Sequence, residues 1–217
     1  MNPHAELIIP AGPAAGGGFD GYIFDCDGTL AETMPLHYKA WCAAFADWKT
    51  PFVFDEDYFY HLGGTPTVEI VRIFNEKYGT DYDPQKLSEH KEEIFVGIMH
   101  ELTPIDEVVD LARAYKAAGK PVSVASGGWR HIVDRTLERI GLKDFFPIIV
   151  TPENVARGKP FPDMFLLAAE KMGTAPDRTL VFEDAPTGIE AAKAAGMQYA
   201  VVPHPSVRGN AKPLNQK

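Results

Sequence analysis

The sequence predicts an α/β fold: a doubly wound parallel sheet with a small helical domain inserted after its first strand. Three observations lead to this prediction. Apolar runs suited to buried parallel strands alternate with helical patterns over most of the chain. This rhythm is broken over residues 34–102, where helical periodicity dominates. Two apolar runs end on pairs of acidic residues, and open α/β sheets bind their ligands at the carboxyl ends of the strands.

Short segments rich in β-branched and aromatic residues are expected to form the strands. They span residues 22–25, 121–125, 147–150, 179–182 and 199–202. Apolar residues at helical spacing predict the helices that connect the later strands. These patterns span residues 105–118, 130–140, 163–172 and 188–195. A glycine follows each of the last three, as is common where a helix closes in the left-handed conformation.

Residues 34–102 contain no convincing buried strand. Their apolar stripes are Trp41, Ala44, Phe45 and Trp48; Val68, Val71, Phe74 and Tyr78; and Leu87, Ile94, Ile98 and Leu102. A crossover between parallel strands needs only one helix, so this insert predicts a bundle over the strand ends, where it can act as a lid. We therefore expect a cap domain at 34–102, a core domain at 19–33 and 103–217, and a mobile leader at 1–18.

The composition limits the classes of partner. A net charge of −9 and a pI near 5.2 disfavour nucleic acid and anionic membrane surfaces. The two cysteines, Cys26 and Cys42, are too few for a disulfide framework and favour a reducing, cytoplasmic location. No apolar stretch is long enough to span a membrane, and no basic region typical of a signal peptide precedes the short apolar patch near the N-terminus. We expect a monomer that acts on a small molecule.

Residues 22–30 carry the strongest chemical signal. An apolar run ends on Asp25 and Asp27, which lie on the same side of an extended chain, and Gly28 follows where the backbone can turn. Two converging carboxylates are costly unless a cation lies between them, so they indicate a metal ion with one carboxylate left for chemistry. The alternative is that both acids merely end a strand and begin a turn. Cys26, between them, should point into the core.

Three later segments strengthen a phosphate-handling interpretation. One predicted strand ends in Ser126, followed by Gly127, which together can present a hydroxyl and free N–H groups to an anion. Lys159 lies in a loop whose prolines fix the backbone, where a lysine suits a phosphate or a carboxylate. Glu183 and Asp184 close another apolar strand and can complete a Mg²⁺ site. Each signal is weak alone, because Ser-Gly-Gly is a common loop sequence and most lysines are simply solvated.

These motifs, taken in order from Asp25-Cys26-Asp27-Gly28-Thr29 to Glu183-Asp184, resemble those of the haloacid dehalogenase superfamily. The insert resembles the helical cap of its β-phosphoglucomutase-like branch, and the resemblance covers residues 21–202. It implies a Mg²⁺-dependent phosphatase acting on small sugar or polyol phosphates. Dehalogenases of this superfamily lack the second aspartate, so Asp27 disfavours that chemistry. A phosphorylated receiver domain is also doubly wound, but it lacks a helical insert.

The resemblance implies a role for each motif residue. Asp25 would be the nucleophile that forms an aspartyl phosphate, and Asp27 would be the acid and base, with its pKa raised by nearby carboxylates. Mg²⁺ would bind Asp25, the backbone carbonyl of Asp27 and Asp184, with Glu183 bound to the ion or just outside its ligands. The phosphate oxygens would be held by Gly28, Thr29, Ser126, Gly127 and Lys159.

The branch contains both phosphatases and mutases, and the sequence favours a phosphatase. In β-phosphoglucomutase an arginine and a lysine early in the cap bind the second phosphate. The matching loop here, residues 62–67, has no positive charge and is closer to that of bacterial sugar phosphatases acting on fructose 1-phosphate or 6-phosphogluconate. Missing charge means missing binding energy for a second phosphate. A mutase remains the alternative, with Arg130 as a possible anchor. His37 would either contact the leaving group or lie on a helix surface.

Overall fold

The computed structural model describes residues 6–13, 18–63 and 65–203, and these contain a five-stranded parallel sheet. The strand order is β3-β2-β1-β4-β5, so β1 lies in the centre. The strands are β1 (Gly21–Phe24), β2 (Val122–Ala125), β3 (Ile148–Val150), β4 (Thr179–Glu183) and β5 (Gln198–Val201). Because all strands are parallel, the carboxyl ends of β1, β2 and β4 meet at one edge.

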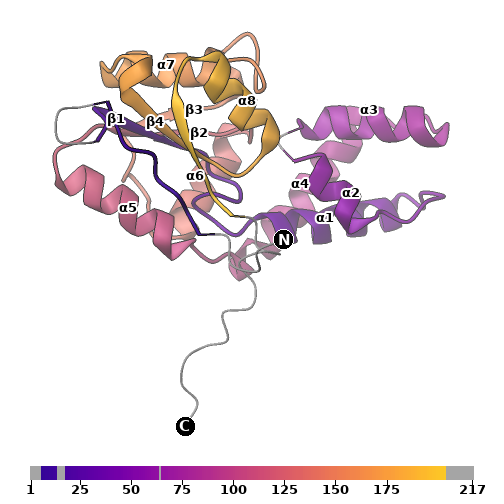
Figure 1. Cartoon of the computed structure of the whole chain (residues 1–217). Helices are drawn as coiled ribbons and strands as arrows, with labels where there is room; N and C mark the ends of the chain where they lie inside the picture. The colour runs from indigo at the N-terminus through magenta and orange to yellow at the C-terminus, as the bar shows by residue number, and fades with distance from the viewer. Residues whose placement is uncertain (1–5, 14–17, 64, 204–217) are drawn as a thin grey trace.

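Helices cover both faces of this sheet, as Figure 1 shows. They are α5 (Asp106–Ala117), α6 (Arg130–Arg139), α7 (Asp163–Met172) and α8 (Pro186–Ala194). Tyr22 and Phe24 belong to the core cluster that includes apolar residues of α5 and α6, whereas Ile23 belongs to the cluster of α7 and α8. This alternation along β1 is the two-residue period of a strand with both faces buried. Cys26 lies in the first of these clusters, as predicted.

The predicted α/β fold is confirmed, and its strands lie within one residue or so of their expected positions. Short 3-10 turns were not predicted; they are η1 (Met99–Glu101), η2 (Pro152–Asn154) and η3 (Pro176–Arg178). Turns of this kind are too short to show a periodic apolar pattern. No helix of the described ranges is long and apolar enough to cross a membrane.

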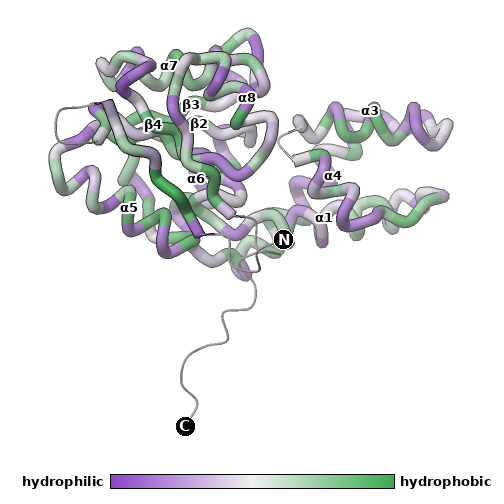
Figure 2. Tube along the Cα trace, viewed as in Figure 1, coloured by the Kyte–Doolittle hydropathy of each residue, from purple (hydrophilic) through white to green (hydrophobic). Residues whose placement is uncertain are grey.

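The insert after β1 folds into helices that lie to one side of the sheet (Figure 1). They are α1 (Met34–Asp47), α2 (Glu56–His61), α3 (Thr67–Tyr78) and α4 (Pro84–Ile98). They share an aromatic cluster of their own, in which Trp41, Phe45 and Phe74 are almost fully buried. Hydrophilic and hydrophobic residues alternate along α3 and α5 in Figure 2, as expected for helices with one buried face. That residues 34 and 102 are the boundaries of a separate cap domain stays a prediction.

Two adjacent linkers join the insert to the sheet layer. Ala31 and Pro104 form an antiparallel bridge, and the Ile105 amide donates to the carbonyl of Leu30 at 2.9 Å. The outgoing and returning chains are therefore held together at one point. This arrangement places the helical insert directly beside the carboxyl end of β1, where the two aspartates lie.

Candidate active site

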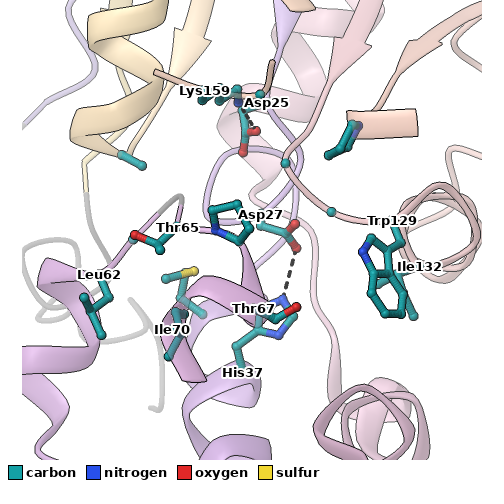
Figure 3. Close-up of a pocket in the computed structure, with 18 of the residues that line it drawn as sticks. Asp25, Asp27, His37, Leu62, Thr65, Thr67, Ile70, Trp129, Ile132 and Lys159 are labelled. Carbon is teal, nitrogen blue, oxygen red and sulfur yellow. Dashed lines mark hydrogen bonds and ion pairs between the residues drawn. The ribbon is translucent and has the colours of Figure 1, made fainter. Parts of the chain in front are cut away.

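A cavity of about 250 Å³ opens where the insert faces the carboxyl ends of the strands. Figure 3 shows side chains from both parts of the chain around it. Asp25, Asp27 and Lys159 line it from the sheet side, and residues of α1 to α4 line it from the other. Asp25, Asp27 and Lys159, which the sequence analysis predicted as site residues, therefore line one cavity.

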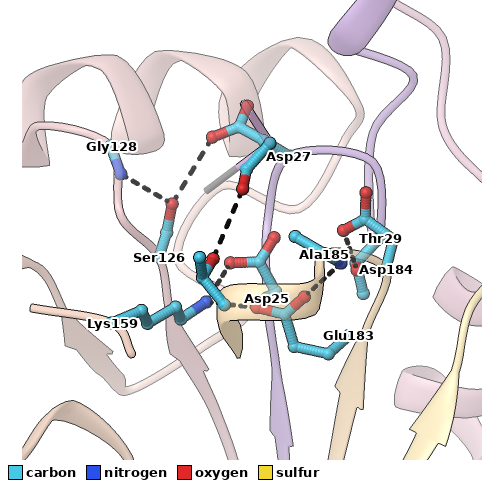
Figure 4. A network of polar contacts seen from close by, with 11 residues as sticks. Asp25, Asp27, Thr29, Ser126, Gly128, Lys159, Glu183, Asp184 and Ala185 are labelled. Atoms are coloured by element: carbon cyan, nitrogen blue, oxygen red, sulfur yellow. Dashed lines mark hydrogen bonds and ion pairs between the residues drawn. The ribbon is translucent and has the colours of Figure 1, made fainter. Parts of the chain in front are cut away.

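The centre of the site is a buried cation between two carboxylates. Lys159 Nζ donates to Asp25 Oδ1 and to Glu183 Oε1, both at 2.6 Å (Figure 4). All three side chains are less than one-tenth exposed. Charge-assisted hydrogen bonds of this length are strong, and so a single lysine fixes the orientation of both acids.

Asp184 is held beside this group from the opposite side. Its Oδ1 accepts a hydrogen bond from Thr29 Oγ1 at 3.1 Å. A side chain at Gly28, where φ is +77°, would bring its Cβ to 2.2 Å from Asp184 Oδ2. The turn after β1 therefore accepts Asp184 only because residue 28 is a glycine. A Cβ at Gly188 would similarly lie 1.7 Å from Glu183 Oε1, so a second glycine makes room for the second acid.

The acids form an arrangement suited to a hard cation. Ligand oxygens of Asp25, Glu183 and Asp184 all lie within 4.8 Å of one another. Burial, together with the charges of Glu183 and Asp27, raises the pKa of Asp25 to about 8 despite the attraction of Lys159. Burial and the charges of Glu183 and Asp25 raise the pKa of Asp184 well above its ordinary value. Two buried carboxylates and the partly exposed carboxylate of Asp184 have one lysine between them, and an all-oxygen donor set of this kind fits Mg²⁺.

Asp27 faces away from these acids, and this corrects one expectation. Its Oδ1 lies 3.5 Å from His37 Nε2, and its Oδ2 lies 3.5 Å from the hydroxyl of Ser126. Burial alone would raise the pKa of Asp27, but the contact with His37 and the charge of Lys91 lower it below its ordinary value. The predicted raised pKa is therefore wrong for this state of the site. The attraction of His37 and Lys91, both on the insert, outweighs the effect of burial.

His37 in turn contacts a lysine that the sequence analysis missed. Lys91, on α4, is only 1% exposed, and its Nζ lies 2.7 Å from His37 Nδ1 and 3.0 Å from Glu92 Oε1. The ring of His37 stacks on Phe95 with centroids 3.9 Å apart. The missed signal was the spacing: Lys91 stands four residues after Leu87 and four before Phe95, on a buried stripe.

Only some of the predicted phosphate-binding residues line the cavity. Gly127 and Lys159 line the cavity. The Ser126 hydroxyl accepts a hydrogen bond from the Gly128 amide at 3.1 Å and is fully buried beside Asp27. Gly28 and Thr29 lie next to the carboxylate of Asp184, and the Gly28 amide donates to the carbonyl of Ala31 within the turn. Their observed contacts support the acid cluster, and a contact with phosphate stays a prediction for both.

Arg130 does not line the cavity in this structure. Its guanidinium pairs with Asp134 one turn along α6, at 2.9 Å, and its amide donates to Glu153. Lys39, another basic residue, lies on α1 of the insert and pairs with Glu101 at 2.6 Å. Both side chains are thus paired with acids, and neither is among the residues that line the cavity. Of that loop, the described residues that line the cavity are uncharged: Leu62, Gly63, Thr65, Pro66 and Thr67.

Comparison with known proteins identifies relatives of this arrangement. Residues 22–202 match the family model described as haloacid dehalogenase-like hydrolase. The chain is 35% identical to a fructose-1-phosphate phosphatase of Escherichia coli over 82% of this chain and 94% of that protein. It is 31% identical to a β-phosphoglucomutase of Bacillus subtilis over 81% and 79% of the two chains. Its fold matches that of a CbbY variant from Rhodobacter sphaeroides in complex with xylulose 1,5-bisphosphate, with a TM-score of 0.76, 29% identity, and coverage of 83% and 84%.

Proposed function

Because this chain belongs to the haloacid dehalogenase-like hydrolases, we propose that it hydrolyses small sugar or polyol phosphates with the help of Mg²⁺. The chain is a phosphoric monoester hydrolase by this membership and by its phosphatase relatives. The observation that carries the proposal is the contact of Lys159 with both Asp25 and Glu183, beside Asp184. These contacts would bring together a cation for the phosphate oxygens (Lys159), a nucleophile (Asp25) and metal-binding carboxylates in one cavity.

Asp25, Glu183 and Asp184 would hold Mg²⁺, which would neutralise charge on the transferring phosphoryl group. Asp27 would contribute its backbone carbonyl, as its carboxylate faces His37 instead. Burial raises the pKa of Asp25 and the positive charge of Lys159 opposes this rise, so Lys159 favours the ionised, nucleophilic form of the carboxylate. Lys159 is also positioned to neutralise a phosphate oxygen, because it lines the cavity at the same point.

The reaction would proceed in two displacements at phosphorus. An oxygen of Asp25 attacks the phosphorus atom, and the bond to the sugar oxygen breaks while Asp27 donates a proton to that oxygen. Asp27 then takes a proton from a water molecule, whose oxygen attacks the phosphorus of the aspartyl phosphate. Asp25 is regenerated and inorganic phosphate is released.

Asp27 must carry a proton in the first displacement, although its pKa is lowered in the free protein. A bound phosphate dianion would place negative charge beside Asp27 and so raise its pKa. Substrate binding, rather than the resting site, would then supply the acid form. The His37 Nε2 directed at Asp27 Oδ1 lowers the pKa of Asp27, so this contact favours the ionised form that would act as the base in the second displacement.

The cavity favours a phosphatase over a phosphomutase. A mutase must hold a second phosphate at the end of the sugar remote from Asp25. The basic residues that line the cavity are His37, Lys91 and Lys159, and both lysines are already paired with carboxylates. Arg130 pairs with Asp134 outside the cavity. The described wall therefore offers no unpaired lysine or arginine to a second phosphate.

Two measurements test the proposal. Release of inorganic phosphate is followed for a panel of hexose, pentose and polyol monophosphates with Mg²⁺. The protein is also incubated with β-glucose 1-phosphate and a trace of glucose 1,6-bisphosphate. We expect free phosphate in the panel and little glucose 6-phosphate in the second reaction. Glucose 6-phosphate forming much faster than free phosphate would overturn the phosphatase assignment, and inactivity over the whole panel would overturn the substrate class.

A further inference from the structure

We propose that Glu92 selects the substrate by the charge of the end remote from its phosphate, accepting a neutral hydroxyl and rejecting a carboxylate or second phosphate. This inference rests on the proposed function, since it concerns the substrate of the same site. It is carried by one buried ion pair, Lys91–Glu92, in the wall of the cavity.

The ion pair lies on the insert side of the cavity, beyond His37. Lys91 Nζ contacts Nδ1 of the His37 ring, and Nε2 of the same ring faces Asp27. The imidazole therefore separates the pair from the acids of the sheet. Glu92 follows Lys91 on α4, and its side chain is only 12% exposed. A substrate with its phosphate at Asp25 would extend its other end toward this wall.

The carboxylate of Glu92 has unused hydrogen-bonding capacity. Its Oε1 accepts from Lys91 at 3.0 Å, whereas its Oε2 is buried without a hydrogen-bond partner in the parts of the chain that the structure describes. A buried acceptor without a donor is unfavourable. After a small rotation of the carboxylate, a substrate hydroxyl would supply the missing donor. A neutral hydroxyl end is therefore the better complement.

A substrate whose remote end is anionic would be repelled by Glu92 and would find no free positive charge. Glu92 already neutralises Lys91, so Lys91 offers no free positive charge. The nearby uncharged wall consists largely of apolar side chains, among them Trp41, Leu62, Ile70 and Ile132. A second anion would lie against a carboxylate in a poorly solvated space, where like charges repel strongly. Specificity would thus arise from repulsion as well as from a favourable hydrogen bond.

Two substrates that differ only at this end provide the test. Sorbitol 6-phosphate ends in a CH₂OH group where 6-phosphogluconate carries a carboxylate. The ratio of their kcat/KM values is measured for the wild type, Glu92→Gln, Glu92→Asp and Glu93→Gln. The last is the matched control, because Glu93 follows directly on α4, has a side chain 80% exposed and does not line the cavity.

We expect the wild type to prefer sorbitol 6-phosphate by about tenfold or more, the effect of one charge-assisted contact. Glu92→Gln frees Lys91 to pair with the substrate carboxylate and should lower the preference at least fivefold. Glu92→Asp and Glu93→Gln should keep it. A general loss of activity or folding cancels in the ratio, and melting temperatures check that each variant is folded.

The outcomes separate this inference from the proposed function. Hydrolysis of both substrates with the same ratio in wild type and Glu92→Gln would refute the role of Glu92 and leave the phosphatase assignment standing. A wild type that prefers 6-phosphogluconate would refute it as well. Failure of the wild type on both substrates and on the whole monophosphate panel would instead refute the proposed function.

Discussion

The ammonium group of Lys91 lies 2.7 Å from Nδ1 of His37, although the two residues stand on different helices, α4 and α1. Lysine can only donate, so Nδ1 accepts and the remaining ring proton is on Nε2. That atom is the one directed at Asp27 Oδ1. The buried lysine thus sets the histidine tautomer, and the histidine orients the predicted acid and base.

Replacing this lysine should therefore impair catalysis more than substrate binding. We expect Lys91→Met to lower kcat about 10- to 100-fold, the usual effect of losing a residue that orients a catalytic group, and to shift the acid limb of the pH profile. Steady-state kinetics over a range of pH provide the measurement. Lys86→Met, on the exposed side of α4, is the control. Because Glu92 also loses its partner, melting temperatures are recorded; an unchanged kcat in folded Lys91→Met would contradict the prediction.

Mg²⁺ should stabilise the folded protein as well as activate it. Binding to the native state alone adds about 2.7 kcal/mol to the free energy of unfolding when the free metal is 100 times its dissociation constant. We expect Mg²⁺ to raise the melting temperature of the wild type and to have little effect on Asp184→Asn, which lacks one predicted ligand charge. Excess chelator should abolish phosphate release. Full activity in chelator would mean that the acids serve another purpose.

The metal-free protein should become less stable as the pH rises from about 4 toward 8. The folded-state pKa of Asp25 is raised by burial from its ordinary value of 3.8 to about 8, and that of Asp184 is also raised. Between those values the folded protein binds more protons than the unfolded chain, so the free energy of unfolding falls with increasing pH. Urea titrations of chelator-treated protein at several pH values measure this slope.

The variant Asp25→Asn separates the contribution of that residue. Its amide is nearly isosteric with the carboxylate but does not ionise, so the slope between pH 4 and 8 should become shallower. The same variant should lose turnover, because an amide is a poor nucleophile. Substantial activity would place the nucleophile elsewhere, and an unchanged slope would show that Asp25 is ionised in the metal-free protein as readily as in the unfolded chain.

Much of the fold could be predicted because buried parallel strands are continuous apolar runs. Tyr22-Ile23-Phe24 is such a run, and the structure places it in the centre of the sheet. The short helix α2 escaped prediction because six residues, Glu56 to His61, are too few to show a period. Its start depends on a local cap, the side chain of Asp55, which accepts from the Tyr58 amide.

The acids could be predicted as a group, but not which way each faces. Asp25 and Asp27 are two residues apart, yet one carboxylate contacts Lys159 and the other contacts His37. The chain leaves the strand conformation after Phe24, so the two-residue alternation no longer holds. The environment of Asp27 is set by the packing of α1 against α4, which the local sequence does not specify.

The turn after β1 gives the sharpest test of the acid cluster. Gly28 and Gly141 have nearly the same φ, +77° and +75°, so alanine suffers similar backbone strain at both, on the order of 1–2 kcal/mol. The two positions differ in space. A Cβ at residue 28 would lie 2.2 Å from Asp184 Oδ2, whereas no heavy atom of the described residues lies within 4 Å of one at residue 141. Gly28→Ala should therefore displace Asp184, weaken stabilisation by Mg²⁺ and lower phosphate release about 10- to 100-fold, as expected when the support of a metal-binding group is disrupted. Gly141→Ala should lower the melting temperature and leave both metal response and activity in place. If the two variants lose activity alike, the strained turn rather than the position of Asp184 is what the site requires.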